Sequence, residues 1–276
     1  MEKYSVLMSV YKKAGVEEFR LSVKSILEQT YPPDQFVIVC DGPIEKDLRD
    51  EIKWLKESNK SLFTIVKLKS NHGLAYALNE GLKVCRNDLV ARMDADDYSL
   101  PKRCEIQVDE YQKNPNLALL GGYTKHFRKD ISDVSEKVNT FPINMNDIKK
   151  TFRRECPFSH PAMMYRKKAV LACGGYDSQL RRSQDHDLFS KMISNGYEGS
   201  NVNKVLLYFR ANDECLARNK NRESCKIRVL LQKRMLQRGD CSLFDFLYIW
   251  IAMLVSRIMP VPIYRKIYAI IKKSGD

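Results

Sequence analysis

The chain has 276 residues, of which 44% are hydrophobic, and a formal net charge of +13 at pH 7. This length allows one large domain or a domain with an appendage, and the hydrophobic content excludes a disordered protein. The eight cysteines show no Cys-x-x-Cys and no paired Cys/His spacing, which favours free thiols in a reducing compartment over disulfides or a zinc site.

Strand and helix patterns alternate along the first part of the chain. The apolar segment 4–11 reads as a strand and not as a secretory signal, so a cytoplasmic protein is expected. Further strands are predicted over 36–42, 62–68 and 88–94, and helices over 17–30, 44–56 and 74–85. This alternation predicts an α/β fold with a doubly wound, mostly parallel sheet.

The later part of the chain is less regular and predicts a smaller sheet. The expected elements are helices over 101–114 and 184–196, strands over 117–127 and 201–210, and a strand, short helix and glycine turn over 158–177. From Asn212 the composition becomes basic and amphipathic. We therefore expect a globular domain over 1–211 and a helical C-terminal extension over 212–276.

The extension combines bulky apolar clusters with basic residues. Its longest apolar run, Phe246–Val255, is far shorter than the ~20 residues that a membrane-spanning helix needs. From residue 201 onward, 15 Lys and Arg stand against 6 Asp and Glu, a net charge of +9. This pattern favours a helix lying in the headgroup region of a membrane. The alternative is a helix packed on the protein's own core. Nucleic acid is a poor partner for so apolar a segment.

Three polar or aromatic residues fall where predicted strands end. Tyr11, Asp41 and Asp94 each stand at the carboxyl end of a strand, which is where open α/β sheets bind ligands. The first strand is not followed by Gly-x-Gly-x-x-Gly, and Gly-Lys-Ser/Thr is absent from the sequence. A nucleotide-type pocket is therefore expected, without a dinucleotide-binding or P-loop motif.

The stretch "MDADD" concentrates three carboxylates in four residues of a basic chain. Continued strand alternation would place Asp94 and Asp96 on one side and Asp97 on the other. Two carboxylates on one side suit a hard divalent cation, Mg²⁺ or Mn²⁺. The alternative is an acidic surface turn in which Asp96 or Asp97 caps the next helix.

Several segments in order resemble the family 2 inverting glycosyltransferases with the GT-A fold. They are "SVLMSVYKK", "SILEQTYPPDQFVIVCDGP", "NHGLAYALNEGL", "LVARMDADDYSLPKRCEIQ", "SHPAMMYRK", "GGYD" and "QDHDLFSKM". The similarity covers about residues 4–210 and is greatest to enzymes of bacterial capsule, exopolysaccharide and O-antigen synthesis. It implies a nucleotide-sugar-binding half over 1–98 and an acceptor-binding half over 99–211.

The resemblance also implies roles for individual residues. Tyr11 matches the ring that packs on the nucleotide base, and Asp41 the residue that holds the base edge. Asp94 matches the position that faces the ribose and the metal, and Asp96 the ligand of the metal that bridges the diphosphate. Asp185 matches the general base.

The chemistry of an inverting transfer supports one distant carboxylate as the base. A direct displacement at the anomeric carbon requires a group that accepts the proton of the acceptor hydroxyl. Asp185, in "SQDHDLF", fits this role, although Gln184 stands where the family usually has Glu. The alternatives are that Asp185 only complements the helix dipole, or that Asp187 is the base.

Weaker assignments complete the expected site. On the acceptor side, His160 is placed near the acceptor or diphosphate, and Gly174 and Gly175 in a turn with positive φ. A structural role is the alternative for His160. The remaining candidates are Asn71 and Gly73, which open a helix whose free N–H groups could face phosphate, and Arg92 and Arg210, which could reach the diphosphate.

The resemblance predicts transfer of one hexose from a UDP-sugar to a polyprenyl-diphosphate-linked saccharide at the inner face of the cytoplasmic membrane. A processive polysaccharide synthase is disfavoured because the Gln-x-x-Arg-Trp signature is missing. A sugar-1-phosphate nucleotidyltransferase is disfavoured because it would show a glycine- and arginine-rich loop after the first strand, where this chain has "YKKAG". A non-catalytic, membrane-bound regulator that binds a nucleotide sugar remains the alternative.

Overall fold

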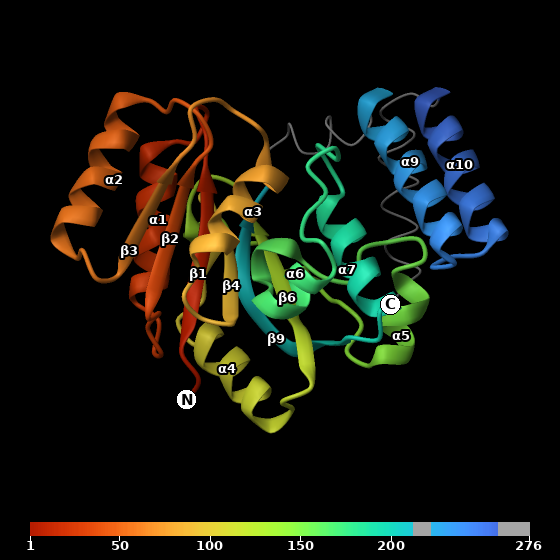
Figure 1. Cartoon of the computed structure of the whole chain (residues 1–276), viewed down its shortest axis with the longest axis horizontal. Coiled ribbons are helices and arrows are strands. Elements are labelled where there is room, and N and C mark those ends of the chain that lie inside the picture. The colour runs from red at the N-terminus through yellow and green to blue at the C-terminus, as the bar shows by residue number, and fades with distance from the viewer. Residues whose placement is uncertain (212–221, 259–276) are drawn as a thin grey trace. The chain divides into compact units, whose positions relative to one another are not determined.

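The computed structural model describes residues 1–211 and 222–258. The chain divides into two compact units, Met1–Ala211 and Asn212–Asp276 (Figure 1). The first unit is an α/β domain, which confirms the expected fold class. Its first half contains β1 (Tyr4–Val10), α1 (Val16–Leu27), β2 (Gln35–Cys40), α2 (Lys46–Ser58), β3 (Phe63–Lys67), α3 (Leu74–Val84) and β4 (Leu89–Asp94).

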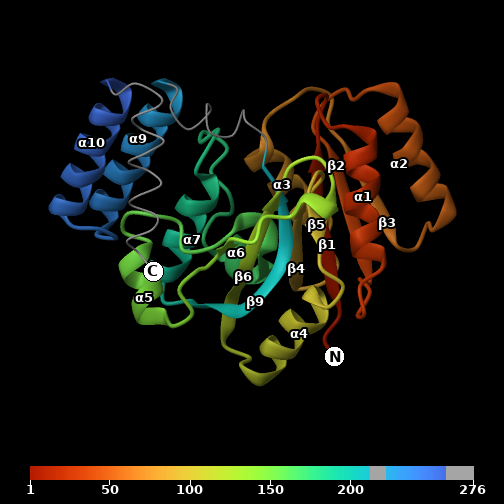
Figure 2. The same ribbon diagram turned by 180° about the vertical axis from the view of Figure 1, so that it is seen from behind.

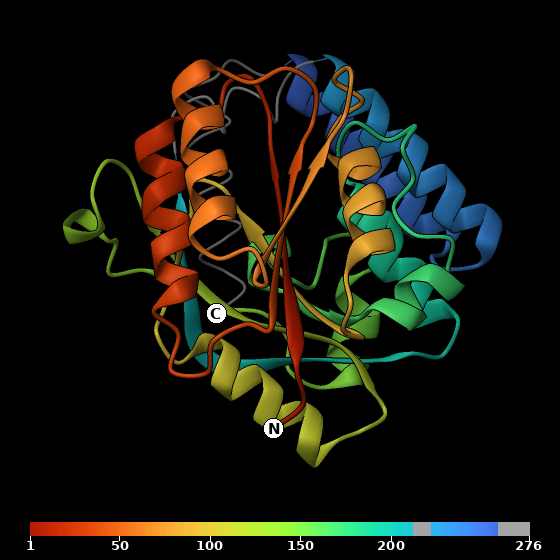
Figure 3. The same cartoon turned by 60° about the vertical axis from the view of Figure 1, so that its left-hand side comes forward.

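Helices cover both faces of the strands β3-β2-β1-β4, which are all parallel. Helices α1 and α2 lie on one face and α3 on the other (Figure 3). The strands are buried on both sides because alternate residues enter different cores. Val6 and Met8 join the core cluster that includes Phe19 of α1. Leu7 lies against α3, where a Cβ at Gly81 would come within 2.3 Å of its side chain.

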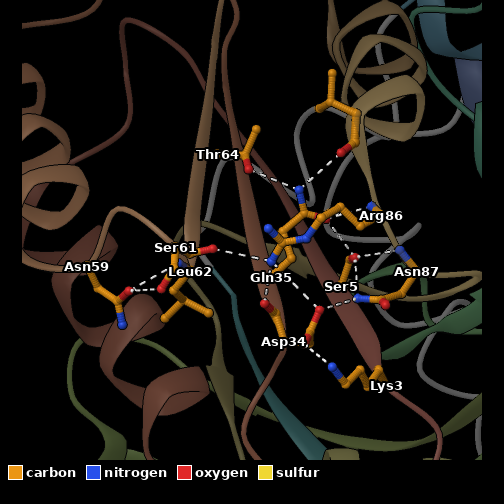
Figure 4. A network of polar contacts seen from close by, with 11 residues as sticks. Lys3, Ser5, Asp34, Gln35, Asn59, Ser61, Leu62, Thr64, Arg86 and Asn87 are labelled. Carbon is orange, nitrogen blue, oxygen red and sulfur yellow. Dashed lines mark hydrogen bonds and ion pairs between the residues drawn. The ribbon is translucent and has the colours of Figure 1, made fainter.

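A polar network closes the amino ends of these strands (Figure 4). The buried Gln35 amide donates to Thr64 Oγ1 (2.9 Å) and to the carbonyl of Val84 (3.0 Å). Its Oε1 accepts from the backbone N–H of Arg86 (2.7 Å). The connection between α3 and β4 is therefore fixed at the end of the sheet opposite to Asp94.

The second half of this unit continues the same sheet. Its elements are β5 (Tyr98–Ser99), α4 (Arg103–Lys113), β6 (Leu117–Phe127), η1 (Ile131–Asp133), β7 (Val138–Asn139), α5 (Met145–Thr151), η2 (His160–Ala162), β8 (Met164–Arg166), α6 (Lys167–Ala172), α7 (Gln184–Ser194) and β9 (Glu198–Arg210). The nine strands have the order β3-β2-β1-β4-β8-β6-β9-β5, with β7 paired to β6. The long strands β6 and β9 lie next to each other in Figure 2.

The smaller sheet expected for this half is therefore an extension of the first and not a separate sheet. The junction is β8, which pairs antiparallel with β4 and with β6. Arg103, fully buried in α4, reinforces it by donating to the carbonyls of Arg92 (2.7 Å) and Met163 (3.2 Å).

The described part of the second unit is a pair of helices, α9 (Arg222–Arg238) and α10 (Leu243–Ile258). Ser242 and Asp245 cap α10: the Asp245 N–H donates to Ser242 Oγ, and the Ser242 N–H donates to Asp245 Oδ2, both at 3.1 Å. Among the described residues, none of the helices has the length and apolarity needed to cross a membrane. The basic end of the expected interfacial segment, from Arg265 to Lys273, lies outside the described residues.

Candidate active site

Parallel pairing brings the three expected strand-end residues together. Val10 is in register with Cys40, and Ser9 with Asp94, so Tyr11 and Asp41 follow neighbouring strands beside Asp94. The Asp41 N–H donates to the carbonyl of Val10 at 2.8 Å. Tyr11 is 44% exposed and open to solvent at this edge. The convergence predicted from strand ends is present.

Asp41 anchors the loop that leads into α3. Its carboxylate accepts from the Asn71 side chain (2.8 Å), the His72 N–H (2.8 Å) and the Gly73 N–H (2.9 Å). The approach is so close that a Cβ at Gly42 would lie 2.6 Å from the nitrogen of Asn71. The N–H of Gly73, expected to be free for phosphate, is thus occupied by Asp41.

The acidic stretch forms a compact cluster at the end of β4. Oxygen atoms of Asp94, Asp96 and Asp97 all lie within 4.8 Å of one another. The expectation that Asp97 would face the opposite side from Asp94 and Asp96 is wrong. The strand ends at Asp94 and the chain turns at residues 95–96, so the alternation of side chains stops there.

Mutual repulsion and burial shift the titration of this cluster. Part of the Asp96 side chain is exposed to solvent. Its carboxylate is nevertheless partly desolvated by nearby protein atoms and is repelled by the Asp94 carboxylate, and together these raise the pKa of Asp96 to about 6. Burial raises the pKa of Asp97 well above its usual value, and Asp94 and Asp96 add to the rise. Asp97 Oδ2 is buried and has no hydrogen-bond partner among the described residues. The cluster can therefore accept a cation.

Arg92 is the cation already present beside this cluster. It is 1% exposed, and its Nη2 pairs with Oδ1 of Asp94. Burial by itself lowers the pKa of Arg92, but the Asp94 carboxylate more than offsets it, so the net shift is upward. Nε and Nη1 are buried and unpartnered among the described residues. Arg92 thus orients Asp94 from beneath the site.

Arg210, expected to reach the diphosphate, lies at the acidic turn. Its backbone N–H donates to Asp97 Oδ1 (2.8 Å), and its Nε donates to the carbonyl of Asp96 (2.9 Å). Its Nη1 donates to the carbonyls of Arg128 (3.1 Å) and Lys129 (2.8 Å). These donors face backbone and not an open pocket.

Helix α7 carries the expected base in its first turn. The Asp185 side chain is half-buried, whereas Asp187 is 2% exposed and its carboxylate lies 3.0 Å from Nζ of Lys191. Ser183, which precedes the helix, adopts a left-handed conformation with φ of 56°. Asp187 is thus engaged within the helix, and Asp185 is the more accessible of the two carboxylates.

His160 belongs to a buried chain of polar groups. Its Nε2 lies 2.9 Å from Tyr176 Oη, and that hydroxyl donates to Tyr165 Oη at 3.4 Å. Burial and the charge of Arg92 lower the pKa of His160 well below its usual value. His160 is therefore a neutral core residue, as in the structural alternative, and not an open acceptor contact.

The two glycines form a turn locked to α3. Gly174 and Gly175 have φ of 81° and 68°. Asn79 of α3 accepts from the Tyr176 N–H (2.9 Å) and donates to the Tyr176 carbonyl (2.7 Å). A Cβ at Gly175 would lie 2.7 Å from Asn79 Oδ1, so this position requires glycine. The turn therefore holds Tyr176 against α3.

A hollow of about 170 Å³ opens between the start of α3 and the segment before α7. It is lined by His72, Gly73, Leu74, Ala75, Ser178, Leu180 and Arg181. Asn79, Tyr176 and Arg181 were not among the expected site residues. The motif "GGYD" could have indicated Tyr176, whereas the contact of Asn79 spans 97 residues and has no local signal.

Comparison with known proteins places these features in context. The family described as "Glycosyl transferase family 2" matches residues 5–174. An uncharacterized glycosyltransferase of Haemophilus influenzae is 33% identical over 266 residues, covering 96% of this chain and 97% of the relative. The amylovoran biosynthesis glycosyltransferase AmsE of Erwinia amylovora is 30% identical with the same coverage. An Escherichia coli UDP-Gal:alpha-D-GlcNAc-diphosphoundecaprenol beta-1,3-galactosyltransferase is 30% identical, covering 96% of each chain.

Solved structures share the fold at low sequence identity. The mannosyltransferase PcManGT of Pyrobaculum calidifontis, in complex with GDP-Man and Mn²⁺, superimposes with a TM-score of 0.65 at 14% identity, covering all of this chain and 81% of that one. S. aureus TarS 1–349 in complex with UDP-GlcNAc gives a TM-score of 0.62 at 16% identity, covering 92% and 72%. This chain spans 43% of the longer TarS crystal structure.

Proposed function

Because the chain belongs to glycosyl transferase family 2, we propose that it transfers a single hexose from a UDP-sugar to a lipid-linked saccharide, with inversion, in bacterial surface polysaccharide synthesis. The observation that carries the proposal is the convergence of Tyr11, Asp41 and the acidic turn at one edge of the sheet. A separate, half-buried carboxylate, Asp185, lies in the first turn of α7. The Escherichia coli relative, whose name gives a UDP-sugar donor and a diphosphoundecaprenol-linked acceptor, supports the substrate classes.

The acidic turn fits a divalent cation. Its three carboxylates offer only hard oxygen ligands within 4.8 Å, and one buried oxygen of Asp97 has no protein partner among the described residues. Asp94 and Asp96 would hold Mg²⁺ or Mn²⁺, with Asp97 as a further candidate. When bound, the ion supplies positive charge that stabilises the developing charge of the departing nucleoside diphosphate.

The protein's own residues divide the remaining work. Tyr11 stacks on the base, and the loop anchored by Asp41 shapes the nucleotide pocket. Asp185 accepts the proton of the acceptor hydroxyl as that oxygen attacks the anomeric carbon and the bond to UDP breaks. Asp185 is the preferred base because Asp187 is buried and paired with Lys191.

The second unit is the membrane-associating part of this proposal. Over residues 243–255 of α10, where side-chain exposure is described, the exposed large side chains are apolar or aromatic: Leu243, Phe244, Leu247, Tyr248, Trp250, Ile251, Leu254 and Val255. At 100° per residue these positions fall on one arc, and the buried Asp245 and Ile249 lie on the opposite side. Helix α9 adds six Lys and Arg against one Glu. An apolar arc beside a basic helix suits the surface of an anionic bilayer, at the inner face of the cytoplasmic membrane.

The proposal is tested by supplying the purified enzyme with a set of UDP-sugars and a synthetic lipid-diphosphate-GlcNAc acceptor. Mass spectrometry should show one added hexose, and NMR of the product should show inverted anomeric configuration. Binding of UDP without transfer to this or related lipid-linked acceptors would instead support a non-catalytic regulator. Addition of many sugars to one acceptor would contradict the single transfer.

A further inference from the structure

Arg210 makes hydrogen bonds both to the acidic turn and to the loop that follows β6. It is the last residue of β9, and its backbone and side chain together reach Asp96, Asp97 and the loop after β6. Its guanidinium also lies over the ring of Phe127, 4.4 Å from the centroid. Strand, turn and loop therefore meet at one side chain.

The contacts on the turn hold two of the three carboxylate-bearing residues. The Nε bond to the carbonyl of Asp96 (2.9 Å) fixes the backbone from which that side chain projects. The backbone N–H of Arg210 fixes the Asp97 carboxylate through Oδ1 (2.8 Å), while Oδ2 remains without a partner among the described residues. Asp97 is thus turned so that one oxygen is held and the other is left available.

The other end of the guanidinium holds the loop that follows β6. Nη1 donates to the carbonyls of Arg128 and Lys129, and Asp133 accepts from the backbone N–H groups of the same two residues, both at 2.9 Å. Both sides of this short backbone segment are therefore bonded. Arg210 therefore connects the acidic turn to residues 128–129, whose backbone is in turn fixed by hydrogen bonds to Asp133.

We propose that Arg210 is a positioning residue that holds Asp96 and Asp97 in the geometry that binds the divalent cation. The inference rests on the proposed metal site and adds a residue to it that does not touch the ion. A planar guanidinium is required because its fork reaches the turn and the loop at once while stacking on Phe127. A lysine ammonium is a single point and cannot reproduce both directions.

The test measures Mn²⁺ binding directly, by electron paramagnetic resonance, with and without UDP. Arg210→Gln should weaken Mn²⁺ affinity by about tenfold or more, in the range seen when residues supporting metal ligands are removed. Arg210→Lys should lie between Arg210→Gln and the wild type, since it keeps the charge over Phe127. Arg166→Gln is the matched control: Arg166 also stacks on an aromatic ring, 5.2 Å from the centroid of Tyr111, but lies near the amino end of β4.

Thermal unfolding of each variant distinguishes loss of the fold from loss of the metal site. If Arg210→Gln does not fold, the Mn²⁺ affinity of Arg210→Lys is compared with that of the wild type instead. Asp96→Asn distinguishes the two proposals. If Asp96→Asn loses Mn²⁺ binding and both Arg210 variants bind Mn²⁺ as the wild type does, the positioning role is wrong and the metal site stands. If Asp96→Asn also binds normally, the metal site itself is wrong.

Discussion

Asp185 and Asp187 are two carboxylates on one helix that differ in their surroundings. They lie in the first turn of α7, but Asp187 is buried against Lys191 while Asp185 remains half-exposed. A base must meet the acceptor hydroxyl, so accessibility and not residue type separates them. The sequence pattern favours Asp185 as the base and keeps Asp187 as the alternative.

We expect Asp185→Asn to lower the transfer rate by about 10²-fold or more, because the amide cannot accept the hydroxyl proton. UDP affinity should stay within about twofold of the wild type, since the site at the ends of β1, β2 and β4 is unchanged. Single-turnover kinetics and calorimetry measure the two quantities. The matched variant is Asp187→Asn. A larger rate loss in Asp187→Asn than in Asp185→Asn would move the base to Asp187.

The neutral, buried His160 predicts a dependence of stability on pH. Burial, and then the charge of Arg92, lower its folded pKa below the usual value of about 6.5. Below that pH the unfolded chain binds a proton that the folded chain excludes, so this residue costs stability as pH falls, by up to about 1.4 kcal/mol per pH unit. At pH above about 6.5 the cost disappears.

Urea unfolding of the wild type and His160→Gln at pH 7.5, 6.0 and 5.0 checks this expectation. The variant should lose less stability than the wild type between the first and last pH. Asp96 and Asp97, whose pKa values are raised, act in the opposite direction in both proteins, so only the difference is informative. Parallel losses in the two proteins would show that His160 is already charged in the folded state.

Residue types at strand ends could be predicted from sequence, but their contacts could not. Apolar runs placed Tyr11, Asp41 and Asp94 at one edge because parallel strands share that edge. The Asp41 carboxylate accepts hydrogen bonds from residues 71–73. These partners lie at least 30 positions further along the chain, so no local pattern indicates the contact. The partners of Arg210 likewise depend on the tertiary fold, since Asp96 lies 114 positions before it in the sequence.

At the scale of elements, the turn that ends α6 gives a matched pair of glycines. Gly174 and Gly175 both have positive φ, but a Cβ at Gly174 meets nothing within 4 Å, whereas at Gly175 it meets Asn79 Oδ1 at 2.7 Å. Gly174→Ala should cost about 1–2 kcal/mol for the left-handed conformation. Gly175→Ala should cost more, because the Asn79 bonds to Tyr176 are also disturbed.

Chemical denaturation of the two alanine variants measures the difference. Gly175→Ala should also lower transfer activity, since the turn supports the helix that carries Asp185: Lys191 of α7 donates to the Gly175 carbonyl at 3.3 Å. Equal destabilisation by the two substitutions would show that Asn79 yields without cost. The glycine pair would then matter only for its backbone conformation.

Long elements were predictable and short ones were not. The main strands and helices lie within a few residues of the expected ranges, because each repeats its period several times. β5 and β7, with two residues each, and α5, with seven, are too short to show a period. The break between α9 and α10 had a local signal in Ser242 and Asp245, which form a helix cap.

At the scale of the whole molecule, the expected family and GT-A fold are confirmed by the family match over 5–174 and by structural neighbours with TM-scores of 0.62 to 0.65. The alternation of strands and helices predicted this architecture. The continuous sheet could not be predicted, since the pairing of β8 with β4 joins residues about 75 positions apart.

The exposed face of α10 makes a prediction for the full-length protein. Phe244→Ser, Leu247→Ser and Ile251→Ser together should reduce co-sedimentation with vesicles containing anionic lipid by at least tenfold, because they remove apolar area from the arc. Trp54→Ser, at a 62%-exposed site on α2, is the matched control and should have no effect. UDP binding should be unchanged in both variants.

Two other outcomes would contradict docking to a bilayer. If the wild type forms dimers that the triple variant does not, and vesicle binding is equal in both, the face is an interface between copies of the chain. If both proteins remain monomeric and bind vesicles equally, α10 is not the membrane contact.

The bond between Asn79 and Tyr176 limits how parts of this enzyme can be exchanged with those of its relatives. The Asn79 amide of α3 bonds to both the N–H and the carbonyl of Tyr176, and a Cβ at the neighbouring Gly175 would lie 2.7 Å from Asn79 Oδ1. A chimera that takes residues 99–211 from a relative must therefore also carry a turn that fits Asn79, or these two hydrogen bonds are lost. Residues 79, 175 and 176 should therefore be exchanged together whenever parts of this chain are replaced by those of a relative.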